Sequence, residues 1–215
     1  MKTKLKLNLW AGAFALGALL PAAETVSLEP AELPLCCQPV RGIEPAALPP
    51  ESIYQLDFAF QDDAGAVRQL AELRGQPTMV VMFFAQCSYA CPLLVQDMRK
   101  IREGLSPEQH DQFRMLMVTF DTDRDTVEAL DAYRDRMALD EQWELWRAGA
   151  ADIRTLAMVL GVQFRREPNG DYSHSNLITL LDADGVLAHR RRGLEGGIPA
   201  ASEAMVRLIA RSPGK

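Results

Sequence analysis

After residue 50 the chain alternates between short apolar runs and longer amphipathic stretches. Residues 54–60 alternate apolar with polar or small side chains, which predicts a half-buried strand, and residues 62–65 (Asp-Asp-Ala-Gly) predict a turn. Residues 78–84 and 115–120 are nearly continuous apolar runs. This pattern is typical of central strands that are buried on both faces of a sheet.

Four other stretches have the spacing of helices. The first runs from Pro92 to about Gly104, directly after the first apolar run. Apolar residues recur at near-helical spacing within residues 127–137 and again within residues 153–160, where the following glycine suits a helix C-cap. We expect the last helix at residues 200–210.

A hairpin separates the last two helices. Residues 176–181 and 186–189 predict two strands, and Asp-Ala-Asp-Gly at residues 182–185 predicts the turn between them. Strands that alternate with helices, followed by a hairpin and a final helix, predict an α/β fold in which helices flank a central mixed sheet.

The N-terminus has the features of an export signal. Three lysines in the first six residues precede seventeen uncharged residues, 7–23. This run is near the lower limit of about 17 residues for a membrane-spanning helix, so a cleaved signal is favoured over a retained anchor. We therefore expect the domain to be exported, in the periplasm or facing the extracytoplasmic side of a membrane, and an anchor would associate it with that membrane.

Residues 24–51 are rich in proline and have little periodicity, which predicts an extended linker between the signal or anchor at 1–23 and a domain at 52–212. The linker contains the adjacent pair Cys36 and Cys37, which is hard to bridge internally without strain. Two interpretations stay open for this pair: exposed thiols that pair with another molecule or merely tolerate the compartment, and auxiliary handling of metal or thiols.

The charge pattern argues against nucleic-acid binding. The formal net charge is -6, and the chain has no large basic field. The short clusters Arg165–Arg166 and 190–192 are expected to be solvated charges on loops or edge strands.

Cys87 and Cys91 are the main candidates for chemistry, because they lie where an apolar strand leads into a helix. Pro92 suits the first position of that helix. The N-terminal end of a helix carries partial positive charge and favours thiolates over thiols. A pair of thiolates there can be oxidised to a disulfide or can hold a soft metal.

Three segments in order resemble the Sco/SenC family: the Cys-x-x-x-Cys-Pro motif that starts at Cys87, Phe-Asp-Thr-Asp-Arg-Asp-Thr at residues 120–126, and Tyr-Ser-His-Ser at residues 172–175, which precedes an apolar strand and an Asp-x-x-Gly turn. The resemblance spans residues 52–210. It implies a thioredoxin-like fold and copper bound by Cys87, Cys91 and His174. It also implies delivery of copper to cytochrome c oxidase, or maturation of its copper site, with an oxidase subunit or another copper or thiol protein as partner.

Three positions depart from the family pattern. Ala85 stands where the family usually has threonine, and Ser88 and Thr122 stand where it usually has proline. None of the three would be a metal ligand, so the departures bear on loop geometry and partner recognition.

The residue types fit copper. Two thiolates and an imidazole form a soft set suited to Cu(I), and one further ligand would complete a tetragonal Cu(II) site. A structural zinc site would need a fourth ligand, and the sequence offers no clear one beside His174. His110 and His189 lack a comparable context and are expected to be structural or solvated, and the methionines fit core positions.

Asp121 and Asp125 of the second motif are expected to have different roles. Asp121 follows a strand next to the cysteine strand, so its carboxylate is a candidate for an outer or transient contact with the metal, with a turn carboxylate as the alternative. Asp125 is expected to cap the helix that begins near Thr126.

The alternative function is that of a thiol-disulfide oxidoreductase. In that case Cys87 and Cys91 would be its redox pair, one attacking a partner disulfide and the other resolving the mixed disulfide. His174 would be essential to a metal site and dispensable to this enzyme. A peroxidase is less favoured, because no arginine is evident near Cys87 in the sequence.

Overall fold

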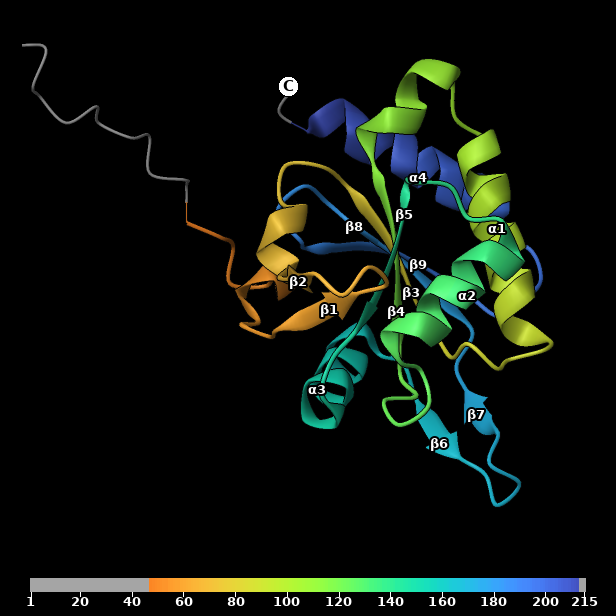
Figure 1. Cartoon of the computed structure of the whole chain (residues 1–215). Coiled ribbons are helices and arrows are strands. Elements are labelled where there is room, and N and C mark those ends of the chain that lie inside the picture. Colours follow the sequence, from red (N-terminus) through yellow and green to blue (C-terminus); the bar gives the residue numbers. More distant parts are fainter. Residues whose placement is uncertain (1–46, 213–215) are drawn as a thin grey trace, which may run out of the picture. The chain divides into compact units, whose positions relative to one another are not determined.

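The computed structural model describes residues 47–212 of the chain. These residues form a seven-stranded sheet with helices packed against it (Figure 1). The strand order is β2-β1-β5-β4-β3-β8-β9. The strands are β1 (Phe60–Asp62), β2 (Val67–Arg68), β3 (Thr78–Phe83), β4 (Arg114–Thr119), β5 (Trp143–Arg147), β8 (Leu177–Leu181) and β9 (Leu187–Arg192). β3, β4 and β5 are parallel, and β1 and β8 pair antiparallel with β5 and β3 at the two sides of this group. β2 and β9 pair antiparallel with β1 and β8 and form the two edges of the sheet. The predicted mixed sheet is confirmed.

Helices cover both faces of this sheet. They are α1 (Ala90–Glu103), α2 (Val127–Met137), α3 (Ala150–Leu160) and α4 (Ile198–Arg211). α1 and α2 connect β3 to β4 and β4 to β5 in the same direction across the sheet, so right-handed crossovers put both helices on one face. α4 packs on α1, β8 and β9, and Figure 1 shows α3 on the opposite side. Every residue of β3 is buried, as the apolar run predicts.

A second, two-stranded sheet lies between α3 and β8 in the chain. β6 (Phe164–Arg166) pairs antiparallel with β7 (Tyr172–His174). This β6–β7 hairpin projects beyond the main sheet in Figure 1. The sequence pattern predicted neither strand, because each has only three residues. The hairpin is nevertheless the segment that carries His174.

The prediction of a strand at residues 54–60 is wrong. Ile53–Gln55 form a 3-10 turn, and β1 begins only at Phe60. The Ser52 side chain accepts a hydrogen bond from the amide of Tyr54 at 3.1 Å. Ile53 and Tyr54 are both buried, and the Tyr54 hydroxyl is 3.1 Å from the Thr78 hydroxyl. Consecutive burial of neighbours is incompatible with the alternation of a half-buried strand.

Two further boundaries differ from the prediction. α1 begins at Ala90, so Pro92 is its third residue; the missing N–H costs nothing there, because the first four amides of a helix have no intrahelical acceptor. β9 runs on through the arginine cluster. As a result Arg191 is only 3% exposed and forms an ion pair with Asp97 of α1 at 2.7 Å, so a solvated role for it is wrong. β5 was not predicted from the sequence.

The predictions for residues 1–46, including Cys36 and Cys37, fall outside the described residues. Within residues 47–212, no helix is both long and apolar enough to span a bilayer.

Candidate metal centre

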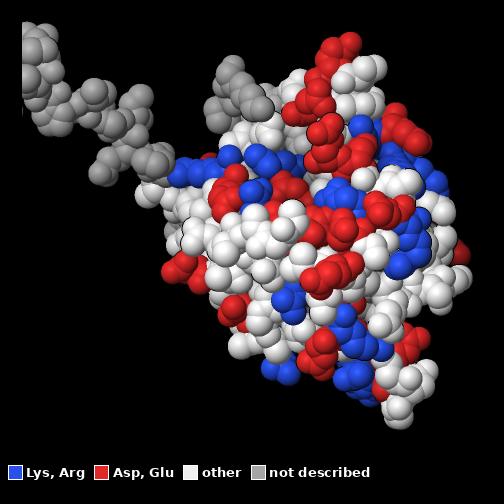
Figure 2. Space-filling view, in the orientation of Figure 1, with Lys and Arg blue, Asp and Glu red and all other residues white. Residues whose placement is uncertain are grey.

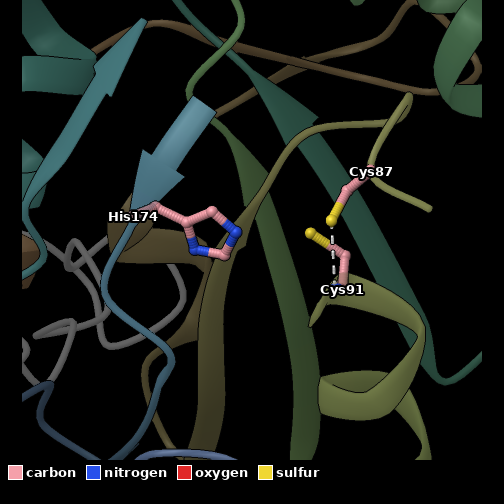
Figure 3. A group of neighbouring side chains, drawn as sticks. All are labelled: Cys87, Cys91 and His174. Atoms are coloured by element: carbon pink, nitrogen blue, oxygen red, sulfur yellow. Dashed lines mark hydrogen bonds between the residues drawn. The ribbon is translucent and has the colours of Figure 1, made fainter. Parts of the chain in front are cut away.

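Cys87 and Cys91 come together at the carboxyl end of β3. Cys87 lies in the loop after the strand and is half-buried, whereas Cys91 is fully buried in the first turn of α1. The backbone N–H of Cys91 donates to Sγ of Cys87 at 3.2 Å (Figure 3). This amide is one of those left without an intrahelical acceptor at a helix N-terminus, so it is free to stabilise a thiolate. Both cysteines are free thiols.

The pKa values of the two thiols are shifted in opposite directions. A hydrogen bond from the Cys91 thiol, followed by contacts with His174 and the backbone amides of Cys91 and Tyr89, lowers the pKa of Cys87 to about 4 against the opposing effect of burial. The same pairing with Cys87, together with burial, raises the pKa of Cys91 far above its ordinary value. At neutral pH Cys87 is therefore the thiolate and Cys91 the thiol.

His174, the last residue of β7, faces this pair. Its Nδ1 lies 3.2 Å from the carbonyl oxygen of Ser175, and because a carbonyl only accepts, Nδ1 carries the hydrogen. Nε2 is therefore the nitrogen available to a metal ion, which it can bind when the ring is neutral and its lone pair is free. In Figure 3 one ring nitrogen of His174 points toward the two sulfur atoms. One ligand atom from each of Cys87, Cys91 and His174 lies within 4.8 Å of the others.

Aromatic side chains hold the His174 ring in place. Its centroid lies 6.0 Å from that of Phe84, edge to face, and 5.3 Å from that of Phe120. Phe120 in turn stacks on Phe164 of β6 at 4.9 Å, and Tyr172 packs on Phe84 at 5.2 Å. This aromatic cluster was not predicted from the sequence. Its signal was present, since Phe84 and Phe120 end the two central apolar runs, but nothing in the sequence related them to the hairpin.

Asp121 is near the site but is engaged elsewhere. It is fully buried just after β4, where it forms an ion pair with Arg124 and accepts a hydrogen bond from the Tyr172 hydroxyl at 3.3 Å. It does not belong to the group of three ligand atoms. The predicted proximity to the metal ligands is thus indirect: Asp121 contacts Tyr172, on the same strand as His174.

Asp125 does not cap α2. Thr126 is the N-cap, and its hydroxyl accepts from the Ala129 amide at 3.3 Å. Asp125 is instead 1% exposed, accepts from the amide of Ala85 at 2.9 Å and from the Thr119 hydroxyl, and has its pKa raised by burial. It thereby joins the end of β3 to the end of β4 beneath the cysteine loop. Residue type alone could not separate these two roles.

A groove of about 690 Å³ opens beside Cys87, between the cysteine loop and α2. Small residues of α2, Ala129 and Ala132, line it together with Arg136. Arg136 donates a hydrogen bond to the carbonyl of Ala85, two residues before Cys87. Arg136 therefore lies near Cys87, although no arginine near Cys87 is evident in the sequence. Cys87 is therefore accessible from this groove, whereas Cys91 is fully buried.

His110 and His189 lie outside this group of ligand atoms. Within residues 47–212, the three-residue group of Cys87, Cys91 and His174 contains no fourth histidine, cysteine or carboxylate, so neither His110 nor His189 contributes to it. A closed structural zinc site normally has four protein ligands. The donor set is that of a soft, three-ligand site with access for exchange.

A sequence model of the SCO1/SenC family matches residues 46–209 of this chain. The chain belongs to the SCO1/SenC family. A relative from Stutzerimonas stutzeri, named as a proposed copper-binding protein, is 29% identical over 147 residues. These residues cover 63% of this chain and 67% of the relative. The Bos taurus mitochondrial protein SCO2 homolog is 37% identical over 93 residues, 40% of this chain but only 33% of that protein.

Solved structures of family members share the fold. Bradyrhizobium japonicum ScoI with copper bound is 22% identical, with a TM-score of 0.60 over 70% of this chain and 96% of that one. A Bacillus anthracis SCO1/SenC family lipoprotein is 21% identical, with a TM-score of 0.64 over 70% and 92%. BsSco, described as having a disulfide switch and as a member of the Sco family of cytochrome c oxidase assembly proteins, is 19% identical, with a TM-score of 0.62 over 72% and 91%. The expected thioredoxin-like fold is confirmed.

Proposed function

We propose that this chain binds copper through Cys87, Cys91 and His174 and delivers it to cytochrome c oxidase, or matures the copper site of that enzyme. The observation that carries the proposal is the convergence of three ligand atoms, from the cysteine loop, α1 and β7, within 4.8 Å of one another. Two sulfurs and an imidazole nitrogen favour Cu(I), and a further ligand from water or a partner would adapt the site to Cu(II).

The protonation states favour loading of such a site. Metal ligands must be deprotonated, and Cys87 already is at neutral pH because its pKa is about 4. His174 carries its hydrogen on Nδ1, which leaves Nε2 as the ligand atom. Of the two cysteines, only Cys91 must still lose a proton as copper binds. Binding of copper should therefore release about one proton from this pair.

Family membership supports copper as the cargo. The copper-bound ScoI structure and the assembly role stated for BsSco describe relatives with the same fold. By analogy, the partner here is a cytochrome c oxidase subunit, with another copper or thiol protein as the alternative. The half-buried Cys87 and the groove beside it provide a surface on which ligand exchange with such a partner can begin.

The same proposal covers the arrangement of the chain. Residues 1–23 would direct export, residues 24–51 would form the linker, and residues 52–212 would form the copper-binding domain on the extracytoplasmic side. The family match begins at residue 46, close to the proposed domain boundary. The Bacillus anthracis relative is a lipoprotein, which supports an extracytoplasmic location. A cleaved signal remains favoured over an anchor.

One observation favours thiol-disulfide oxidoreductase activity as a second candidate: Cys87 is an accessible thiolate and Cys91 a buried thiol beside it. In that reaction the Cys87 thiolate would attack a partner disulfide, form a mixed disulfide and release one partner thiolate. Cys91 would then lose its proton and attack Sγ of Cys87, releasing the second partner thiolate. The partner disulfide gains two electrons, and Cys87 and Cys91 end as a disulfide.

Copper titration of the reduced protein tests the proposal, with His174→Ala as the variant and His189→Ala as a matched control. We expect one copper per chain in the parent and the control, with affinity reduced at least tenfold in His174→Ala. Unchanged affinity in His174→Ala together with retained disulfide reduction would favour the enzyme.

A further inference from the structure

Arg124 lies where three segments of the site meet. Its Nε forms an ion pair with the carboxylate of Asp121, and its Nη1 donates to Oε1 of Gln86 at 3.3 Å. Its guanidinium carbon lies 5.6 Å from the centre of the Tyr172 ring. The side chain is 25% exposed, so most of it is enclosed by these contacts.

Each contact leads to a proposed ligand. Gln86 immediately precedes Cys87 in the cysteine loop. Tyr172 is two residues before His174 in β7, so both side chains point to the same face of that strand. Asp121 contacts Arg124 and also accepts the hydrogen bond from the Tyr172 hydroxyl. Arg124 therefore contacts both the loop that carries Cys87 and the strand that carries His174.

The hairpin needs such a contact. β6 and β7 pair with each other in a sheet of their own. This sheet is separate from the seven-stranded sheet, whose strand β3 leads into the cysteine loop. An isolated two-stranded hairpin is marginally stable in water. The distance between His174 and the sulfurs is consequently set by side-chain contacts, and Arg124 adds a polar contact with the cysteine loop to the aromatic packing on Phe84.

We propose that Arg124 is a positioning residue that holds the His174 hairpin against the Cys87 loop and so sets the spacing of the three ligand atoms. This rests on the proposed copper function. A planar guanidinium can pair with a carboxylate, donate to an amide oxygen and stack on a ring at the same time, whereas the ammonium of lysine cannot. The role therefore depends on the shape of Arg124 as well as its charge.

Hydrogen exchange on the copper-free protein tests the positioning directly. The variants are Arg124→Met and Arg124→Lys, and the control is Arg165→Met, which removes an arginine of the same hairpin that pairs only with Glu167 among the described residues. We expect exchange of the β7 amides to rise at least tenfold in both Arg124 variants, with the exchange of β3 unchanged. Equal exchange in parent and Arg124→Met would overturn the proposal.

Copper binding gives the second measurement. Arg124→Met should weaken Cu(II) binding about 10 to 100-fold, the usual effect of an outer contact, and should remove nitrogen coupling from the Cu(II) resonance spectrum. Adding His174→Ala to Arg124→Met should cause little further loss, because both act through one ligand. Additive losses, or full rescue by Arg124→Lys, would overturn the proposal.

Two outcomes keep the tests separate. If the parent binds no copper, the proposed function fails, while the exchange measurement still decides the role of Arg124. If Arg124→Met does not fold, Gln86→Ala takes its place, because Gln86 is exposed and its change removes only the contact with the cysteine loop. We then expect a smaller increase in β7 exchange, and no increase would overturn the proposal.

Discussion

The hydroxyl of Tyr172 donates a hydrogen bond to Oδ1 of Asp121 at 3.3 Å, and this contact ties the strand of His174 to the loop after β4. Asp121 is fully buried, so its charge is stabilised by Arg124 and Tyr172 in place of water. An effect of Asp121 on copper at the proposed site would therefore pass through Tyr172 to the strand of His174, and through Arg124 to the loop of Cys87.

Asp121→Asn should weaken Cu(II) about 10 to 100-fold and Cu(I) less. The two thiolates dominate binding of the softer Cu(I), whereas the imidazole contributes more to Cu(II). Competition titrations in each oxidation state measure both affinities. Asp123→Asn is the control, because Asp123 is exposed and pairs only weakly with Arg166. Equal losses for both ions would show that Asp121 supports the whole loop and not His174 alone.

The low pKa of Cys87 predicts its reactivity. A group whose pKa is lowered to about 4 is a thiolate throughout the range above pH 5, so alkylation by iodoacetamide should be nearly constant from pH 5 to 8 and should fall below about pH 4.

Cys91→Ala supplies the control, because it removes the thiol that contributes most to this lowering. Its Cys87 should react increasingly fast as the pH rises toward 8. A parent rate that climbs through pH 8 to 9, as for an ordinary thiol, would contradict the assigned hydrogen bonds.

Oxidation and copper binding should exclude each other, because both use Sγ of Cys87 and Sγ of Cys91. Mild oxidation is expected to give a disulfide between these two residues, and the oxidised protein should bind copper at this site at least 100-fold more weakly. Counting thiols with and without copper measures this. A full equivalent of copper retained at the same site after oxidation would disprove the shared use of the sulfurs.

The central mixed sheet and its flanking helices could be predicted from the sequence, whereas the β6–β7 hairpin could not. Cys87 and Cys91 could be placed because a strand runs into a helix at that point, and the family resemblance brought in His174. The β6–β7 hairpin could not be foreseen, since its two strands have three residues each and are too short for a periodic pattern. For this reason the aromatic contacts that orient His174 were also missed.

Buried polar groups were the other failure. By residue type and local sequence, Asp125 was expected to cap a helix and Arg191 to be a solvated charge. Their actual roles depend on partners far away in the chain. Asp125 meets the amide of Ala85, and Arg191 meets Asp97. Such pairings follow from tertiary packing, which no local pattern encodes.

Gly185→Ala should destabilise the domain more than an ordinary glycine substitution. Gly185 has a φ of +80°, and a Cβ there would lie 2.5 Å from the ring of Tyr54. Gly193→Ala is the control, since Gly193 also has a φ of +80° but has nothing within 4 Å of its Cβ position.

We expect a loss of about 1 to 2 kcal/mol in the free energy of unfolding for Gly193→Ala, from backbone strain alone. Overpacking against Tyr54 should add about 1 to 3 kcal/mol for Gly185→Ala. Urea unfolding measures both. Equal losses would show that the Tyr54 ring moves aside without cost.

X-ray absorption at the copper edge of the loaded, reduced protein tests the central claim most directly. The account predicts one copper per chain with two sulfur neighbours and one nitrogen neighbour, and loss of the nitrogen alone in His174→Ala. A copper surrounded only by oxygen and nitrogen, or a nitrogen neighbour that persists in His174→Ala, would contradict it.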